Sequence, residues 1–212
     1  MRRLLIACYC ATCAILLLPL TISPHLRSAY AFTVNHWLAK ARQLEWAIVG
    51  DSMAAGLGNG LFGGSINVAS NGLTIAQITA LAKTANDRYR PRTLVVLAGT
   101  NDVLAERYRA EETKADLTRM LSVLSDLGPR VILTLIPPTR DAAINARIRE
   151  LNAMLAPLAR SRGIVVVDLD ATLAPAGVLL ERFTTDGVHF SDAGNAEWWQ
   201  RLADAAHGDM KR

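Results

Sequence analysis

Short apolar runs alternate along the chain with longer segments in which apolar residues recur every three to four positions. The short runs are rich in Val, Ile and Leu, which is typical of strands that are buried on both faces. They predict strands at Trp46–Val49, Ile66–Ala69, Thr93–Ala98, Arg130–Ile136 and Ile164–Leu169. The longer segments predict helices at Thr74–Arg88, Ala110–Leu127, Asp141–Arg162 and Asp192–Ala206.

This alternation predicts a parallel sheet covered by helices on both faces. The expected fold class is α/β, a single flavodoxin-like three-layer α/β/α sandwich with a five-stranded parallel sheet. The chain has 212 residues, about half of them apolar, which is enough for one core. We expect the domain at residues 46–212, after a linker and short helix in 32–45, around Val34 to Leu44.

The first 31 residues have a targeting pattern. Arg2 and Arg3 precede an uncharged run from Leu4 to Ser23, as in a secretory signal, and Ala29-Tyr30-Ala31 offers a small-residue cleavage site. A run of about 20 residues, each rising about 1.5 Å, is also long enough to span a bilayer of about 30 Å. Residues 1–31 are therefore either a signal peptide or a membrane anchor. Both interpretations place the rest of the chain outside the cytoplasm, because arginines before the run favour a cytoplasmic N-terminus.

Charge and cysteine content exclude several function classes. Of the 23 lysines and arginines, three lie before Phe32, which leaves 20 against 19 acidic residues. This near balance argues against a nucleic-acid-binding protein. All three cysteines, Cys8, Cys10 and Cys13, lie inside the apolar run. The domain after that run therefore has no cysteine for a disulfide, thiol catalysis or zinc ligation.

A serine follows the first predicted strand directly, in Gly50-Asp51-Ser52. Ligands of parallel sheets bind beyond the carboxyl ends of the strands, so Ser52 is placed where chemistry is expected. A serine hydroxyl becomes a nucleophile when a base takes its proton. Asp and Ser are also ordinary residues for capping a helix after a strand, so the tripeptide alone leaves both interpretations open.

The matching base is His189. The other three histidines lie in the targeting segment, in the linker and near the C-terminus. Asp186 precedes His189 by three residues, and Gly187 allows a sharp turn between them. Asp186 can therefore bind one imidazole nitrogen while the other faces the serine. The alternative is that His189 binds a loop carbonyl and Asp186 closes a turn.

Acyl transfer also needs hydrogen-bond donors for the oxyanion that forms on the substrate. Gly72, in Ala69-Ser70-Asn71-Gly72, could offer its backbone N–H. Gly99-Thr100-Asn101-Asp102 presents the side-chain amide of Asn101, and the Ser52 N–H is a third donor. Taken singly, a turn glycine and an Asx turn explain the first two sites equally well.

These segments resemble the four signature blocks of the SGNH (GDSL-like) hydrolase family. They are Gly50-Asp51-Ser52, the Asn71-Gly72 turn, Gly99-Thr100-Asn101-Asp102 and Asp186-Gly187-Val188-His189, in order within residues 46–206. The sequence departs from the family pattern in having Met53 where an aliphatic residue commonly follows the serine. The second block matches mainly through its glycine, which makes Gly72 the weakest assignment.

The resemblance implies a serine esterase with Ser52, Asp186 and His189 as the catalytic triad and with Ser52, Gly72 and Asn101 as the oxyanion hole. Asp102 is expected to hold the Asn101 loop. The expected substrate is a small acyl ester or an O-acylated carbohydrate, and the acyl group is expected to be short. Two alternatives remain: a polysaccharide O-acyltransferase that uses the same triad, and a catalytically silent, membrane-anchored accessory protein of an envelope polysaccharide system.

No cofactor or metal is expected. Gly58-Asn59-Gly60-Leu61-Phe62-Gly63 matches the glycine pattern of dinucleotide-binding loops. That loop must leave a strand directly and meet an acidic residue about 20 positions later. The preceding predicted strand ends at Val49, and residues 80–83 offer no acid. We therefore interpret this segment as a loop beside the active site.

Overall fold

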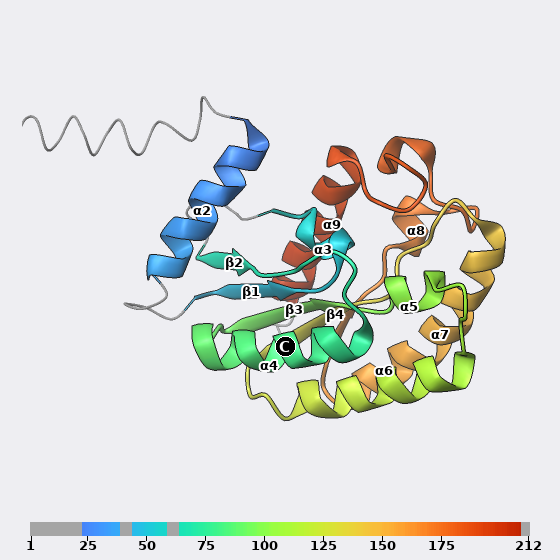
Figure 1. Ribbon diagram of the computed structural model, residues 1–212, viewed down its shortest axis with the longest axis horizontal. Helices are drawn as coiled ribbons and strands as arrows, with labels where there is room; N and C mark the ends of the chain where they lie inside the picture. The colour runs from blue at the N-terminus through green and yellow to red at the C-terminus, as the bar shows by residue number, and fades with distance from the viewer. Residues whose placement is uncertain (1–22, 39–43, 59–63, 209–212) are drawn as a thin grey trace, which may run out of the picture.

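The computed structural model describes residues 23–38, 44–58 and 64–208, which form one five-stranded parallel sheet flanked by helices (Figure 1). The strand order is β2-β1-β3-β4-β5, and every neighbouring pair is parallel. The strands are β1 Trp46–Val49, β2 Ser65–Asn67, β3 Thr93–Leu97, β4 Arg130–Thr134 and β5 Val165–Val167. This arrangement confirms the predicted three-layer α/β/α fold.

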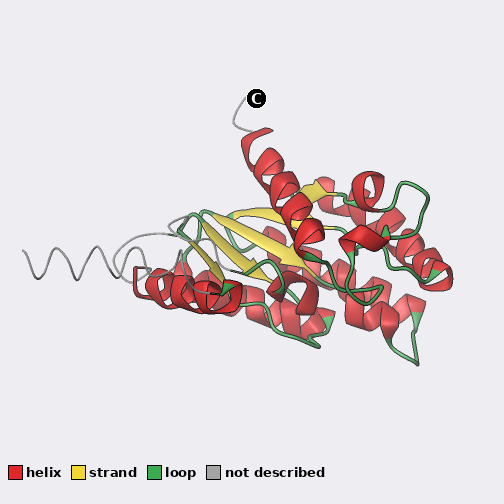
Figure 2. Cartoon of the chain, turned by 90° about the horizontal axis from the view of Figure 1, so that it is seen from above, coloured by secondary structure: helices red, strands yellow, loops and turns green. Residues whose placement is uncertain are grey.

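Alternate residues of each strand face two separate cores. In β1, Ala47 and Val49 pack in one core and Ile48 packs in the other. This is the two-residue period of a strand that is buried on both sides. The first core lies under α4, α6 and α7, and the second lies under α3 and α9. Helices lie on both faces of the sheet (Figure 2).

The long helices match the predicted ones to within two residues at each end. They are α4 Ile75–Tyr89, α6 Ala110–Ser125, α7 Ala142–Arg160 and α9 Asp192–Gly208. The short elements are α3 Ser52–Ala55, α5 Thr100–Leu104, α8 Asp170–Leu173 and the 3-10 helix η1 Glu181–Phe183. Each short element follows a strand or precedes α9, at the end of the sheet where the signature residues lie.

Helix α2 spans Pro24–Leu38, so it begins about ten residues before the short helix expected around Val34 to Leu44. Ala31 is buried, and Phe32 packs against the core under α4. Pro24 is well suited to a first helical position, where the missing backbone N–H costs nothing. The predicted targeting segment, residues 1–31, extends to Ala31 because Ala29-Tyr30-Ala31 offers a cleavage site. In the structure residues 24–31 form the first half of α2, and the targeting role of residues 1–31 stays a prediction.

The apolar run from Leu4 lies almost entirely outside the described residues. Within the described part of the chain, no helix is both long enough and apolar enough to cross a membrane.

Candidate active site

Ser52 is the first residue of α3, directly after β1. The turn is tight, because a Cβ on Gly50 would lie 2.6 Å from the Cβ of Ala54 and 2.7 Å from the carbonyl oxygen of Leu97. Only glycine fits there without moving β3. Asp51 caps the helix, and its Oδ1 accepts a hydrogen bond from the Met53 N–H at 3.0 Å. This turn fixes the position of the Ser52 side chain, which is half-buried.

Ser52, His189 and Asp186 form a continuous hydrogen-bond chain. The distance from Ser52 Oγ to His189 Nε2 is 2.9 Å, and that from His189 Nδ1 to Asp186 Oδ2 is 2.6 Å. Since a carboxylate can only accept, Nδ1 carries the proton and Nε2 is left to accept from the serine hydroxyl. This is the geometry of a nucleophile, a base and an orienting acid.

Backbone bonds hold the loop that carries the acid and the base. Asp186 Oδ1 accepts from the N–H groups of Val188 and His189, at 2.9 and 2.8 Å. Gly187 between them has φ +93°, a conformation that side chains disfavour. The Thr184 hydroxyl donates to the His189 carbonyl oxygen and accepts from the Gly187 N–H, both at 2.8 Å. Both Asp186 oxygens are thus fixed, one by the backbone and one by the imidazole.

The same bonds set the charge of Asp186. The hydrogen bond from His189, and then that from the Val188 N–H, lower the pKa of the Asp186 carboxyl to about 2. Asp186 is therefore ionised across the range in which an esterase works. Its side chain is 53% exposed, so solvent screens this charge from the rest of the protein.

The second and third signature blocks follow the strands beside β1. Gly72 lies in the exposed turn after β2, with φ +74°. Gly99 is the N-cap residue before α5, with φ +110°, and a Cβ on it would lie 2.7 Å from Ile136 Cδ1. The side-chain amide of Asn101 donates to the Leu73 carbonyl oxygen at 3.0 Å. This bond links the Asn101 block to the turn that contains Gly72.

Two carboxyl groups, one half-buried and one fully buried, support these blocks. Asp102 Oδ2 accepts from the Ile75 N–H at 3.1 Å, so it joins α5 to the N-terminus of α4. This contact agrees with the expectation that Asp102 holds the Asn101 loop. Burial raises the pKa of Asp102, and the bond from Ile75 opposes that rise. Burial also raises the pKa of Asp51, against the effects of the Thr100 hydroxyl and the Met53 and Ala54 N–H groups.

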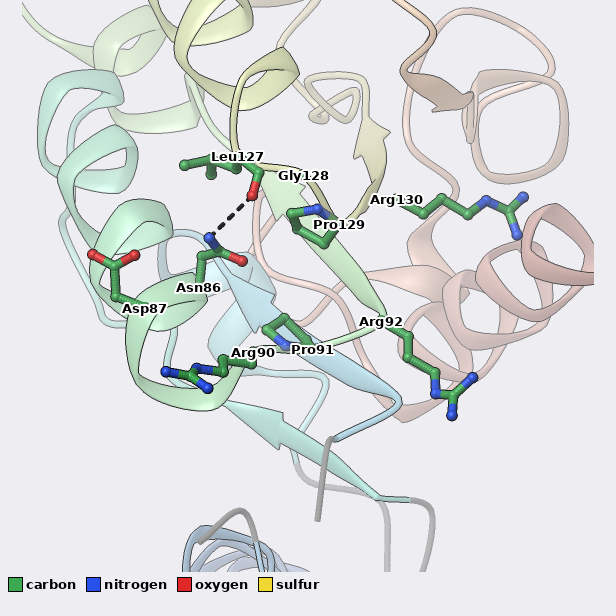
Figure 3. Close-up of a pocket in the computed structure, with 9 residues that line it drawn as sticks. All are labelled: Asn86, Asp87, Arg90, Pro91, Arg92, Leu127, Gly128, Pro129 and Arg130. Carbon is green, nitrogen blue, oxygen red and sulfur yellow. Dashed lines mark hydrogen bonds between the residues drawn. The ribbon is translucent and has the colours of Figure 1, made fainter.

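A separate hollow lies at the opposite end of the sheet (Figure 3). It is bordered by the C-terminal ends of α4 and α6, and the side-chain amide of Asn86 donates to the Leu127 carbonyl oxygen at 3.2 Å across it. No serine or histidine is among its lining residues, which are Asn86, Asp87, Arg90, Pro91, Arg92, Leu127, Gly128, Pro129 and Arg130. This hollow therefore offers no serine nucleophile and no histidine base, in contrast to the carboxyl ends of the strands.

A family comparison agrees with this geometry. The model of the GDSL-like Lipase/Acylhydrolase family matches residues 48–197, which include Ser52 and His189. The chain belongs to this family. Membership identifies it as a serine ester hydrolase, and acyl esters as its substrates.

Solved structures of other GDSL-like proteins share the fold. A GDSL-like lipase from Bacteroides thetaiotaomicron superposes with a TM-score of 0.69 over 84% of this chain and 98% of that chain, at 19% identity. The lipase/acylhydrolase from Enterococcus faecalis gives 0.57 over 77% and 97%, at 20% identity. An acetyl xylan esterase gives 0.59 over 76% and 98%, at 17% identity.

A curated relative matches only in part. The N-acylneuraminate cytidylyltransferase of Streptococcus agalactiae is 29% identical over 102 residues, which are 47% of this chain and 24% of that protein. The chain thus spans about a quarter of the length of that relative.

The structure brings Ser52, His189 and Asp186 into direct contact and joins Asn101 to Leu73, the residue that follows Gly72. Sequence reasoning missed Thr184, whose hydroxyl closes the loop between Gly187 and His189. Its signal is weak, because a threonine two residues before an Asp-Gly turn is common in loops of every kind.

Proposed function

We propose that this protein is an exported serine esterase that removes short O-acyl groups, with Ser52 as nucleophile, His189 as base and Asp186 as orienting acid. The observation that carries the proposal is the hydrogen-bond chain from Ser52 Oγ through the imidazole to Asp186, with its contacts of 2.9 and 2.6 Å. Nothing else in the described part of the chain places a serine against a histidine and an acid in this way.

The proposed reaction has two halves. In the first, His189 Nε2 takes the proton of Ser52 while Oγ attacks the ester carbonyl carbon, and the protonated imidazole then gives this proton to the leaving alcohol. The acyl group stays on Ser52. In the second, His189 takes a proton from water, the resulting hydroxide attacks the acyl-enzyme, and the free acid leaves as Ser52 regains its proton. Asp186 keeps the imidazole oriented and stabilises its positive charge in both halves.

The proposed oxyanion hole consists of the N–H groups of Ser52 and Gly72 and the side-chain amide of Asn101. An amide group carries two N–H donors, and the bond to Leu73 uses one of them. The second remains for a developing oxyanion. The bond to Leu73 also limits rotation of the amide, so this donor is oriented before substrate binds.

The proposed substrate class is an O-acylated carbohydrate. Support comes from the acetyl xylan esterase among the proteins of the same fold and from the partial relative that is named for an N-acylated sugar acid. The open site also favours a bulky alcohol part, because the side chains of His189 and Asp186 are 45% and 53% exposed. Export is proposed from the arginines and apolar run at residues 2–23.

The test of the nucleophile is labelling with a fluorophosphonate probe. We expect the probe to modify Ser52, and Ser52→Ala to abolish both labelling and ester hydrolysis while leaving the thermal transition within a few degrees. Ser70→Ala is the matched control, since Ser70 is an exposed serine after the neighbouring strand. Labelling that survives in Ser52→Ala would contradict the assignment.

The test of acceptor and substrate is incubation of the protein with acylated polysaccharides and simple esters. Free acid as the main product supports the hydrolase. Acyl transfer to glycan hydroxyl groups would contradict the hydrolase and support the transferase. Absence of both reactions would contradict both enzymes and support the silent accessory protein.

Asn101→Ala tests the oxyanion hole. We expect kcat to fall by about 10²–10³ with little change in KM, because the lost donor acts mainly in the transition state. A kcat within a few-fold of the parent would exclude this role for Asn101.

A further inference from the structure

Helix α2 carries an exposed apolar stripe. Leu26 and Trp37 are 60% and 70% exposed, and they are the large hydrophobic residues that stand exposed in the described part of the chain. They lie eleven residues apart, which is about three helical turns, so they share one face. Ala29 and Thr33 lie between them and are exposed, with half-buried Tyr30 beside them. Among the residues of this face whose side chains the structure describes, which are Leu26, Ala29, Tyr30, Thr33 and Trp37, none is charged.

The opposite face of α2 is fixed to the domain. Ala31 is buried, and the side-chain amide of buried Asn35 donates to the carbonyl oxygen of Ser65 in β2. His36 stacks on Phe32 with ring centroids 6.0 Å apart, and its Nδ1 lies 3.2 Å from the Tyr89 hydroxyl. These contacts hold α2 in one orientation. Because they lie on the opposite face of the helix, the stripe faces away from the domain.

The chain before α2 indicates what covers the stripe. Arg2 and Arg3 and the uncharged run from Leu4 to Ser23 end directly where α2 begins, at Pro24. A membrane-spanning run that ends there would deliver α2 to the bilayer surface. Trp and Tyr are the residues that favour the membrane–water interface, and an amphipathic helix lies in that plane with its apolar face down.

We propose that α2 lies on the outer surface of the bilayer and buries Leu26, Tyr30 and Trp37 among the lipid head groups. This inference rests on the proposed location, and within it on a retained rather than a cleaved anchor. The position of Ala29-Tyr30-Ala31 supports retention. These residues lie in the middle of α2, and cleavage there would remove the first half of a helix whose Ala31 is packed against the domain.

The orientation has a consequence for the substrate. Asn35 contacts the first residue of β2, and His36 contacts the last residue of α4, so this half of α2 lies at the amino ends of the strands. Ser52 follows the carboxyl end of β1. A domain held to the bilayer by α2 therefore keeps Ser52 at the far end of its sheet, within reach of envelope glycans rather than of bilayer lipids.

The experiment uses the full chain reconstituted into phosphatidylcholine vesicles whose acyl chains carry bromine, a quencher of tryptophan emission, at either carbons 6 and 7 or carbons 11 and 12. We expect the chain to float with the vesicles and the shallow bromines to quench more than the deep ones. Trp37→Phe should remove most of this quenching. Trp199→Phe is the matched control, because Trp199 packs on the other face of the sheet and its loss should leave the quenching in place. Thr33→Glu, which places a charge in the stripe, should weaken the quenching of Trp37.

Each other outcome overturns a defined part of the proposal. A chain that floats without quenching of Trp37 is anchored, with α2 away from the lipid. A chain that does not float lacks the anchor on which the inference rests. Trp37 shielded from bromine, together with cross-links between chains through α2, would mean that a second copy covers the stripe. Ester hydrolysis is measured separately, and Ser52→Ala should quench like the parent, so failure of the enzymatic proposal is distinguishable from failure of this one.

Discussion

Asp51 lies beside the proposed nucleophile but outside its hydrogen-bond chain. Its side chain is fully buried, and one oxygen caps α3 while the other makes no hydrogen bond with good geometry to any described residue. The buried Thr100 hydroxyl is likewise without such a partner. Burial raises the Asp51 pKa, since it disfavours the charged carboxylate. Asp51 therefore stabilises the fold as a helix cap, whereas the burial of its negative charge lowers the free energy of unfolding.

This difference can be measured with two substitutions. Asp51→Asn keeps the capping oxygen and adds an N–H₂ group that can donate to Thr100, so we expect an unfolding free energy equal to or above that of the parent at neutral pH. Asp51→Ala removes the cap and should lower it by about 1–2 kcal/mol. Denaturant unfolding gives both values. An Asn variant as unstable as the Ala variant would mean that the fold needs the charge itself.

Asp186 gives a prediction with a defined pH window. Its pKa is about 2 in the folded protein against a usual value of 3.8, so its hydrogen bonds stabilise the fold fully above the usual value. This contribution is lost as the pH falls toward 2, where the folded carboxylate takes up a proton. We expect the difference in Tm between the parent and Asp186→Asn to have its full size above about pH 5 and to shrink toward about pH 2. Because the side chain is half-exposed, the difference is small, and a difference that grows on acidification would contradict the assigned direction.

The triad residues were predictable because few residues of the required types lie near the carboxyl ends of the predicted strands. One histidine lay outside the targeting segment, the linker and the C-terminal end, and a serine stood at a strand end. Thr184 and the buried state of Asp51 were not predictable, since threonine and aspartate are common in loops and their burial depends on how distant segments pack. Trp198 and Trp199 followed elementary helix geometry: adjacent positions cannot share a face, and Trp198 is fully buried while Trp199 is partly exposed.

Among the elements, α9 depends on a contact from a distant strand. The guanidinium of Arg130, the first residue of β4, donates to the carbonyl oxygens of Ala205 and Ala206, both at 2.7 Å. These carbonyls belong to the last turn of α9, where no intrahelical partner is left and a positive charge is favourable. Arg130 therefore acts as a C-terminal cap for the helix that covers the second core.

We expect Arg130→Met, which keeps an apolar stem, to lower the unfolding free energy by about 1–2 kcal/mol. Arg92→Met is the matched control. Arg92 precedes β3 at the same edge of the sheet, and its 3.2 Å ion pair with Glu45 is exposed, so its loss should cost less than about 1 kcal/mol. Equal losses in the two variants would show that the cap on α9 contributes nothing beyond a surface charge.

Element boundaries were less predictable than element types. The prediction continued β4 to Ile136, whereas the strand ends at Thr134. Leu135 and Ile136 are nevertheless buried, because they pack in the first core with residues of α4, α6 and α7. An apolar run therefore marks burial rather than strand pairing. The four short helices were missed for a related reason, since three to five residues are too few for a repeating apolar pattern to be seen.

At the scale of the whole molecule, the sheet brings distant segments together. Ser52 and His189 are separated by 137 positions and lie in hydrogen-bond contact. The order of the strands made this convergence predictable, because the carboxyl ends of parallel strands meet at one edge. The placement of α2 was not predictable, since it depends on how one helix face packs on β2 and α4.

The layout of the chain around the site also limits what acyl group can bind. From Asn101 to Asp186 the chain is nearly all taken up by α5, α6, β4, α7, β5, α8 and η1. The connections between them are at most about seven residues, too short to fold into a lid over a lipid tail. The connection between α3 and β2, residues 56–64, contains five glycines, which supply no side-chain surface. Such loops can form the walls of a small pocket but not of a deep channel.

We therefore expect acetyl to butyryl esters to be preferred over acyl chains of ten carbons or more. Each methylene buried in a channel would add about 0.8 kcal/mol of binding, so a true acyl tunnel would make kcat/KM rise steeply with chain length. The measurement is a series of p-nitrophenyl esters from acetate to decanoate, each below its aggregation limit. A plateau or fall after butyrate agrees with a shallow pocket, because the extra methylenes then remain in water. If kcat/KM still rises at octanoate and decanoate, the site contains a tunnel, and the substrate class changes from acylated carbohydrate to lipid.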